Sequence, residues 1–164
     1  MRLDAEILQA IGAAPIEKRA ITNLRTLNEA HDYGSAFSRG LRVDLNGLAI
    51  LFISGTASID EHGKTVHVGD FRAQVRRTYR NITLLLESEG ATWKDVVRTT
   101  NYLRDIERDY VAFNEERTKF FQEQGLDPLP ASTGIQAILC RPELLVEIEC
   151  IAMLRTAQKD KAEG

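Results

Sequence analysis

The chain has 164 residues, of which 43% are hydrophobic and 27% are charged, and its formal net charge is -3. These values are ordinary for a soluble globular protein and fit one domain with a good core. The longest apolar run, residues 48–53, is far shorter than the ~20 residues of a membrane span, and no basic block favours nucleic acid as a partner. We therefore expect a cytoplasmic protein, without a signal peptide, that binds neither membranes nor nucleic acid.

Residues 1–35 contain the weakest structural signals in the chain. Residues 3–12 have the apolar spacing of a short amphipathic helix. Residues 20–27 alternate loosely, as an added strand or an extended arm does, and residues 29–35 are predicted to form a loop. We therefore expect residues 1–35 to form a helix and an arm that precede the main domain.

The signals become sharper from residue 37 onward. Residues 37–45 and 48–54 are predicted strands, and Asn46-Gly47 between them is the strongest hairpin signal in the sequence. Residues 60–64 form a polar turn. Asp70 then has the place of a helix cap, and the apolar face of the following helix continues to a stop at Gly90.

The second half predicts one more helix among three strands. Residues 93–103 include a strand, and a helix with an aromatic face begins at residue 105 or 106. Residues 132–139 are a predicted strand. Residues 144–154 are the last strand, with small and apolar side chains at the even positions, and the polar tail from residue 156 is expected to fray.

The resulting order, β-β-α-β-α-β-β, predicts an α+β domain at residues 36–155. It would consist of one mixed sheet with two helices on one face. The opposite face of such a sheet needs cover, and a symmetric oligomer would provide it.

Cysteines and histidines indicate no redox or metal chemistry. Cys140 and Cys150 do not form a CxxC pair, so we expect two buried, reduced thiols. The three histidines match no metal-binding spacing, and we expect neither a metal nor another cofactor.

Several short motifs follow one another along the chain in a particular order and spacing. The motifs are Ser54-Gly55, Gly69-Asp70, Gln74, Asn81, Asn114, Pro130-Ala131 and the sequence at 146–152. In this order and spacing, they resemble the Rid family of reactive intermediate deaminases, also called YjgF-type proteins. The resemblance implies a chorismate-mutase-like fold, a homotrimer, and ligand clefts at the subunit interfaces.

The resemblance also predicts site residues, with one departure. Active members of the family typically carry Pro-Ala-Arg-Ser, whose arginine holds the carboxylate of a 2-imino acid, whereas this chain has Ser132 and Thr133 after Pro130-Ala131. Serine supplies neither the charge nor the fork of a guanidinium. The family's glutamate corresponds to Glu147, a possible general acid or base, and Phe37 corresponds to its N-terminal aromatic residue. Backbone groups near Ser54-Gly55 would place the water.

Other residues have both a functional and a purely structural interpretation. Arg117 interrupts the aromatic face of the second helix, one turn after Asn114. It could replace the missing cation near Ser132 and Thr133, or its stem could simply pack while its head reaches a polar partner. Glu147 could likewise belong to a solvated strand face.

Two functions follow from these patterns. The first is a hydrolase or deaminase-like enzyme that acts on a small carboxylated enamine, imine or enol ether, with Glu147 as the catalytic residue. The alternative is a non-catalytic trimer that binds a small carboxylated metabolite or serves as a scaffold.

Overall fold

A computed structural model describes residues 16–22 and 36–156. The predicted helix at 3–12 and the predicted loop at 29–35 lie outside these residues. The arm expected at 20–27 is described only as far as residue 22.

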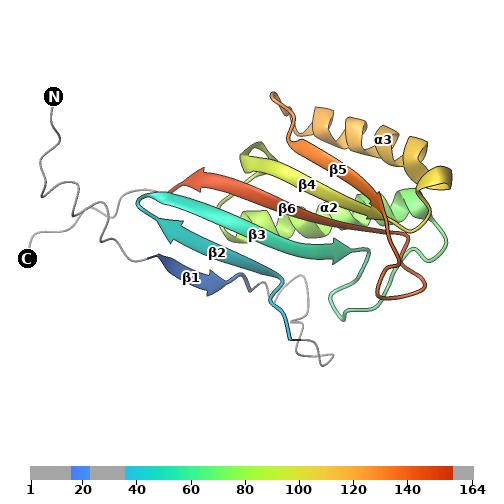
Figure 1. Ribbon diagram of the computed structural model, residues 1–164, viewed down its shortest axis with the longest axis horizontal. Helices are drawn as coiled ribbons and strands as arrows, with labels where there is room; N and C mark the ends of the chain where they lie inside the picture. Colours follow the sequence, from blue (N-terminus) through green and yellow to red (C-terminus); the bar gives the residue numbers. More distant parts are fainter. Residues whose placement is uncertain (1–15, 23–35, 157–164) are drawn as a thin grey trace, which may run out of the picture.

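The described chain folds into one six-stranded sheet with two helices, so the predicted α+β class is confirmed (Figure 1). The strands lie in the order β1-β2-β3-β6-β4-β5, and every neighbouring pair is antiparallel except the parallel pair β4-β5. The elements are β1 (Glu17–Ala20), β2 (Gly40–Leu45), β3 (Leu48–Ala57), α2 (Phe71–Ser88), β4 (Val96–Leu103), α3 (Ile106–Glu123), β5 (Ala131–Gln136) and β6 (Val146–Arg155), with a short 3-10 turn, η2 (Trp93–Asp95), before β4.

Local chemistry sets the limits of these elements. Asn46 and Gly47 both have positive φ, 48° and 79°, as a tight two-residue hairpin between β2 and β3 requires. The Asp70 carboxylate accepts a hydrogen bond from the Ala73 amide and caps α2, and the Asp105 carboxylate caps α3 in the same way. The hairpin and both helix starts are therefore confirmed.

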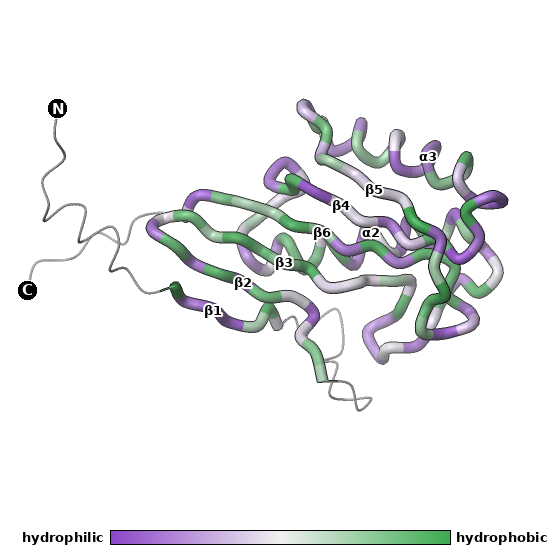
Figure 2. Tube along the Cα trace, viewed as in Figure 1, coloured by the Kyte–Doolittle hydropathy of each residue, from purple (hydrophilic) through white to green (hydrophobic). Residues whose placement is uncertain are grey.

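The core lies between the sheet and the helices. Even-numbered residues of β6 are buried against the helices, as the alternation predicts, and α2 lies behind the central strands in Figure 1. An aromatic cluster joins α2, η2 and α3, and in it the Tyr79 and Phe120 rings stack at 4.4 Å. Figure 2 shows how hydrophobic residues concentrate in β3 and β6, whereas β1 is mostly hydrophilic.

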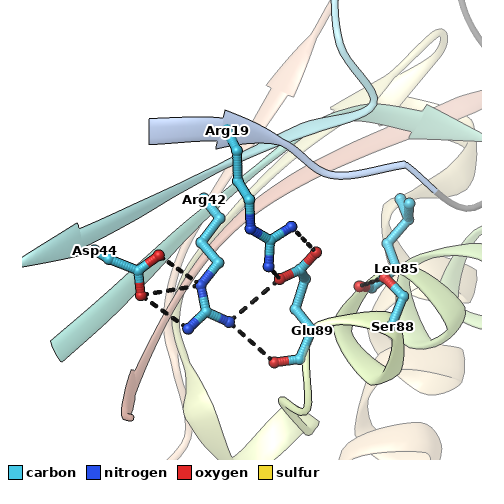
Figure 3. Close-up of polar contacts among 6 residues, drawn as sticks. All are labelled: Arg19, Arg42, Asp44, Leu85, Ser88 and Glu89. Atoms are coloured by element: carbon cyan, nitrogen blue, oxygen red, sulfur yellow. Dashed lines mark hydrogen bonds and ion pairs between the residues drawn. The ribbon is translucent and has the colours of Figure 1, made fainter. Parts of the chain in front are cut away.

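An ion-pair network joins β1 to the end of α2 (Figure 3). Arg19 of β1 donates a 2.8 Å hydrogen bond to the Glu89 carboxylate, and Arg42 of β2 contacts both Glu89 and Asp44. The Arg42 hydrogen bond lowers the pKa of Asp44. Because Ile21, next to β1, is fully buried in the core, this short strand is anchored by packing as well as by charge.

The face of the sheet opposite the helices, here called the open face, retains exposed apolar side chains. Phe52 on β3, Met153 on β6 and Ile135 on β5 are 44%, 42% and 42% exposed. Odd-numbered residues of β6, including Glu147 and Glu149, point to this same face. The open face therefore carries both exposed apolar side chains and two glutamates.

Candidate functional site

Glu147 lies where β3 is irregular. The pairing of β3 with β6 shifts register between Ile53 and Thr56, so Ser54 and Gly55 form a bulge close to Glu147. A β-carbon on Gly55 would lie 2.0 Å from the Glu147 carboxylate oxygen, so a larger residue here would force the Glu147 side chain to move. Glycine at position 55 thus leaves room for the Glu147 carboxylate in this position.

The Glu147 carboxylate lines a cavity of about 490 Å³ on the open side of the molecule. This volume lies within the range of small-molecule sites. We call it the Glu147 cavity. Its lining residues are Phe37, Arg39, Ser54, Gly55, Ala57, Ile59, Cys140, Arg141, Leu144 and Glu147.

Burial shapes the acidity of the Glu147 carboxyl group. Desolvation and, to a lesser extent, the charge of Glu149 raise its pKa. Burial and Glu149 also raise the pKa of Tyr102, which lies across from Glu147 on β4. A carboxyl group with a raised pKa, held beside a glycine bulge in a cavity, can exchange protons with a bound ligand.

A second polar group lies between α3 and the edge strand β5. Arg117 donates hydrogen bonds to the Ser132 hydroxyl at 3.0 Å and to the Asn114 side-chain oxygen, and its guanidinium lies 5.2 Å from the Phe113 ring centre. The Ser132 hydroxyl also accepts a 3.0 Å hydrogen bond from the buried Asn101. Arg117, Asn114 and Ser132 are here called the β5-edge group.

The structure therefore divides the predicted site residues into two sets. Phe37, Ser54, Gly55 and Glu147 share one cavity. The β5-edge group lies on the helix side of the sheet, because Ser132 is in register with Thr99 and Thr99 faces the core. Thr133 faces the open side, where its hydroxyl accepts a hydrogen bond from Arg98. Within one chain, Arg117 does not contact Glu147.

The predicted site did not include the two charged residues that line the Glu147 cavity besides Glu147 itself, Arg39 and Arg141. Arg39 is 6% exposed, and its guanidinium lies 5.4 Å from the Phe37 ring centre. Arg141 donates a 2.6 Å hydrogen bond to the Gly63 carbonyl. Neither position is part of an apolar periodicity, so only the fold brings them together with Glu147.

The expectation of two buried thiols is wrong for Cys140. Cys150 points into the core, and burial raises its pKa to about 12. Cys140 is exposed and lines the Glu147 cavity, because it lies in the loop before β6 rather than in a strand.

The two cysteines should therefore react very differently with a thiol-specific disulfide reagent. We expect one thiol per chain to react in the native protein and the second to react only after unfolding, since a buried thiol is shielded and un-ionised. Absorbance of the released thiolate measures both phases, and Cys140→Ser is the control that should remove the fast phase. Two fast thiols, or a fast phase that survives in Cys140→Ser, would contradict this assignment.

Among residues 16–22 and 36–156, no helix is long and apolar enough to cross a membrane. The same residues contain no cluster of three histidine, cysteine or acidic side chains suited to a metal ion.

Comparison with known proteins gives a consistent family. A model of the family Endoribonuclease L-PSP matches residues 30–154. The chain is 36% identical over 103 residues to the 3-aminoacrylate deaminase RutC of Acinetobacter baylyi. The aligned segment covers 63% of this chain and 78% of the relative. The chain is 32% identical over 102 residues to a RutC family protein of Pyrococcus abyssi, with 62% and 76% covered.

Solved structures show the same fold. The YjgF gene product of E. coli matches with a TM-score of 0.68 and 25% identity, covering 84% of this chain and 99% of that chain. YyfA of Yersinia pestis, described as a member of the conserved Rid family, matches with a TM-score of 0.68 and 25% identity over 84% and 100% of the two chains. Since the family model spans most of the sequence and the fold agrees, the chain belongs to the Endoribonuclease L-PSP family, the Rid or YjgF-type proteins.

Proposed function

We propose that this protein is a Rid-type hydrolase, deaminase-like in its chemistry, that acts on a small carboxylated enamine, imine or enol ether. The observation that carries the proposal is the Glu147 carboxyl group, half-buried against Gly55 in a cavity of about 490 Å³ and with a raised pKa. The 3-aminoacrylate deaminase among the relatives supports the same class of chemistry.

The proposed reaction on an imine is an addition followed by an elimination. Glu147 accepts a proton from a water molecule while the water oxygen bonds to the imine carbon, and it returns the proton to the nitrogen. In the resulting carbinolamine the hydroxyl group gives up its proton, and the nitrogen gains one, with Glu147 able to carry it. The carbon–nitrogen bond then breaks, so that ammonia leaves and a carbonyl compound remains. An enamine first gains a proton on carbon to become the imine. Ser54 and Gly55 would position the water beside the carboxyl group.

The substrate carboxylate needs a cation, and we propose that Arg117 provides it across a subunit interface. Arg117 lies beside Ser132, on the opposite side of the sheet from Glu147 of its own chain. The β5 strand is an edge of the sheet, so a neighbouring subunit can bring its β5-edge group to the mouth of the Glu147 cavity. A homotrimer would form three such composite sites, and Thr133 would contribute a hydroxyl to each.

Assembly into a trimer is the first expected result. The apolar open face, with Phe52, Ile135 and Met153 exposed, favours burial against other copies. Three chains of 18.4 kDa give a particle of about 55 kDa, which light scattering measures directly. A stable monomer at micromolar concentration would contradict the proposal of a site shared between subunits.

The activity itself is tested by ammonia release. Amino-acid oxidases generate the imines in situ, and enzymatic elimination generates the enamines. We expect faster ammonia release with the protein than without it for at least one carboxylated substrate. A protein that binds these carboxylates but does not accelerate hydrolysis would instead be a non-catalytic binding or scaffold trimer.

A further inference from the structure

Two arginines line the Glu147 cavity and have no role in the proposed reaction. Among its described lining residues, Arg39 and Arg141 are cationic and Glu147 is the single carboxylate. All three belong to the same chain. Because the proposed function already places one substrate carboxylate on Arg117 of a neighbouring subunit, these two arginines suggest a further acidic group on the ligand.

Arg141 is held in place by a braced loop. Arg104 donates to the carbonyl oxygens of Leu144 and Arg141, at 2.6 and 2.5 Å. The fully buried Gln74 accepts a 2.9 Å hydrogen bond from the Leu145 amide and donates one to the Glu143 carbonyl. A loop fixed at so many backbone atoms keeps its side chains near one geometry, which is what a pre-organised binding site needs.

The Arg141 side chain is itself oriented. Its Nη1 donates to the Gly63 carbonyl at 2.6 Å and approaches the Thr65 hydroxyl at 3.4 Å. A guanidinium has five N–H donors in a fixed fork, so it can be held by the protein and still bind a carboxylate. Arg39, stacked on Phe37, adds a second positive charge to the same cavity.

We propose that the ligand is a small dicarboxylate, with its second carboxylate bound by Arg141 and favoured by the charge of Arg39. This rests on the proposed function, in which Arg117 takes the first carboxylate. A monocarboxylate would contact Arg117 alone, whereas a second carboxylate could also accept hydrogen bonds from the Arg141 guanidinium. The cavity, at about 490 Å³, has room for a ligand of this size.

Binding of two inert acids of equal length tests the proposal without any turnover. Calorimetric titration of the assembled protein compares glutarate with pentanoate, which differ only in the second carboxylate. We expect glutarate to bind at least about tenfold more tightly, the usual effect of one hydrogen-bonded charge pair. Arg141→Met should lower glutarate affinity to that of pentanoate and leave pentanoate unchanged. Arg117→Met is the matched control that should weaken both acids.

Three results would overturn the dicarboxylate assignment. They are equal affinities in the wild type, a preference that survives in Arg141→Met, or a loss of both acids in that variant, which would mean that Arg141 binds the only carboxylate. If Arg141→Met does not fold, Arg141→Lys takes its place. Lysine keeps the positive charge but not the paired N–H donors of the guanidinium, so this variant should retain part of the glutarate preference. The comparison of the two acids on the wild-type protein does not depend on either variant.

These outcomes separate the ligand class from the reaction. If the protein prefers glutarate but hydrolyses no enamine or imine, the dicarboxylate site stands and the proposed function is wrong. If hydrolysis depends on Glu147 but the protein does not prefer glutarate, the proposed function stands and the dicarboxylate site is wrong.

Discussion

Glu147→Gln is expected to lower hydrolysis of an accepted enamine or imine by at least about 100-fold, the low end of general acid–base catalysis. Glutamine keeps the shape of the side chain but accepts no proton from water. Because the cavity and its arginines remain, glutarate should still bind to the variant. Steady-state ammonia release and calorimetric binding, measured on the same preparation, separate the loss of chemistry from a loss of fold.

A second variant checks that the half-buried carboxyl group is the cause of this loss. Gly55→Ala should also reduce turnover, because its β-carbon would lie 2.0 Å from the Glu147 oxygen and displace the carboxylate without removing it. Activity of Glu147→Gln within threefold of the wild type would exclude Glu147 as the catalytic residue.

Glu147→Gln is also expected to change how the stability of the protein depends on pH. The Glu147 pKa is raised above its ordinary value of 4.5, so the folded state holds this proton more tightly than the unfolded chain. Its stabilising contribution is fully present below pH 4.5 and is lost as the pH rises through the folded pKa. Thermal unfolding should therefore show Glu147→Gln gaining stability relative to the wild type across that window. An unchanged difference at all pH values would indicate a solvated carboxylate.

Hydrolysis of 2-iminopropionate is expected to be at least about 100-fold slower than that of a Rid deaminase with arginine in the Pro-Ala-Arg-Ser motif. We propose that Ser132 stands at that arginine position. Loss of a bidentate charge pair costs about 3 kcal/mol of orientation and binding, which corresponds to roughly a 100-fold lower rate. An assay with enzymatically generated imine, with the arginine-containing relative run in parallel, measures the ratio.

The reverse substitution is the matched control for this result. Ser132→Arg should increase turnover of 2-iminopropionate, since Ser132 lies on the exposed edge strand β5, which can accept a longer side chain. A wild-type rate equal to that of the relative would contradict this prediction, because it would mean that Arg117, the proposed carboxylate ligand, orients this monocarboxylate as well as the family's arginine does.

Much of the fold was predictable because its signals are local. The Asn46-Gly47 turn and the Asp70 cap each act within a few residues, and the β6 alternation repeats over the strand. The assignment of Glu147 to the open face followed from that alternation alone. The pairing of β6 between β3 and β4, by contrast, depends on contacts distant in sequence.

The composition of the site was less predictable for the same reason. Arg39 precedes β2 and Arg141 precedes β6, and neither lies in a periodic pattern that marks its direction. Only the β3 bulge and the loop braced by Arg104 bring them beside Glu147. Cys140 was assigned to the interior because free cysteines usually are buried, a tendency that its loop overrides.

A crystal structure of the assembled protein soaked with glutarate would show whether Glu147, Arg141 and a neighbouring Arg117 form one binding site. We expect ligand density in the Glu147 cavity, with one carboxylate within hydrogen-bond distance of Arg141 and the other near Arg117 of a neighbouring subunit. A cavity filled by apolar side chains of the neighbour, or glutarate bound away from Glu147, would contradict the account.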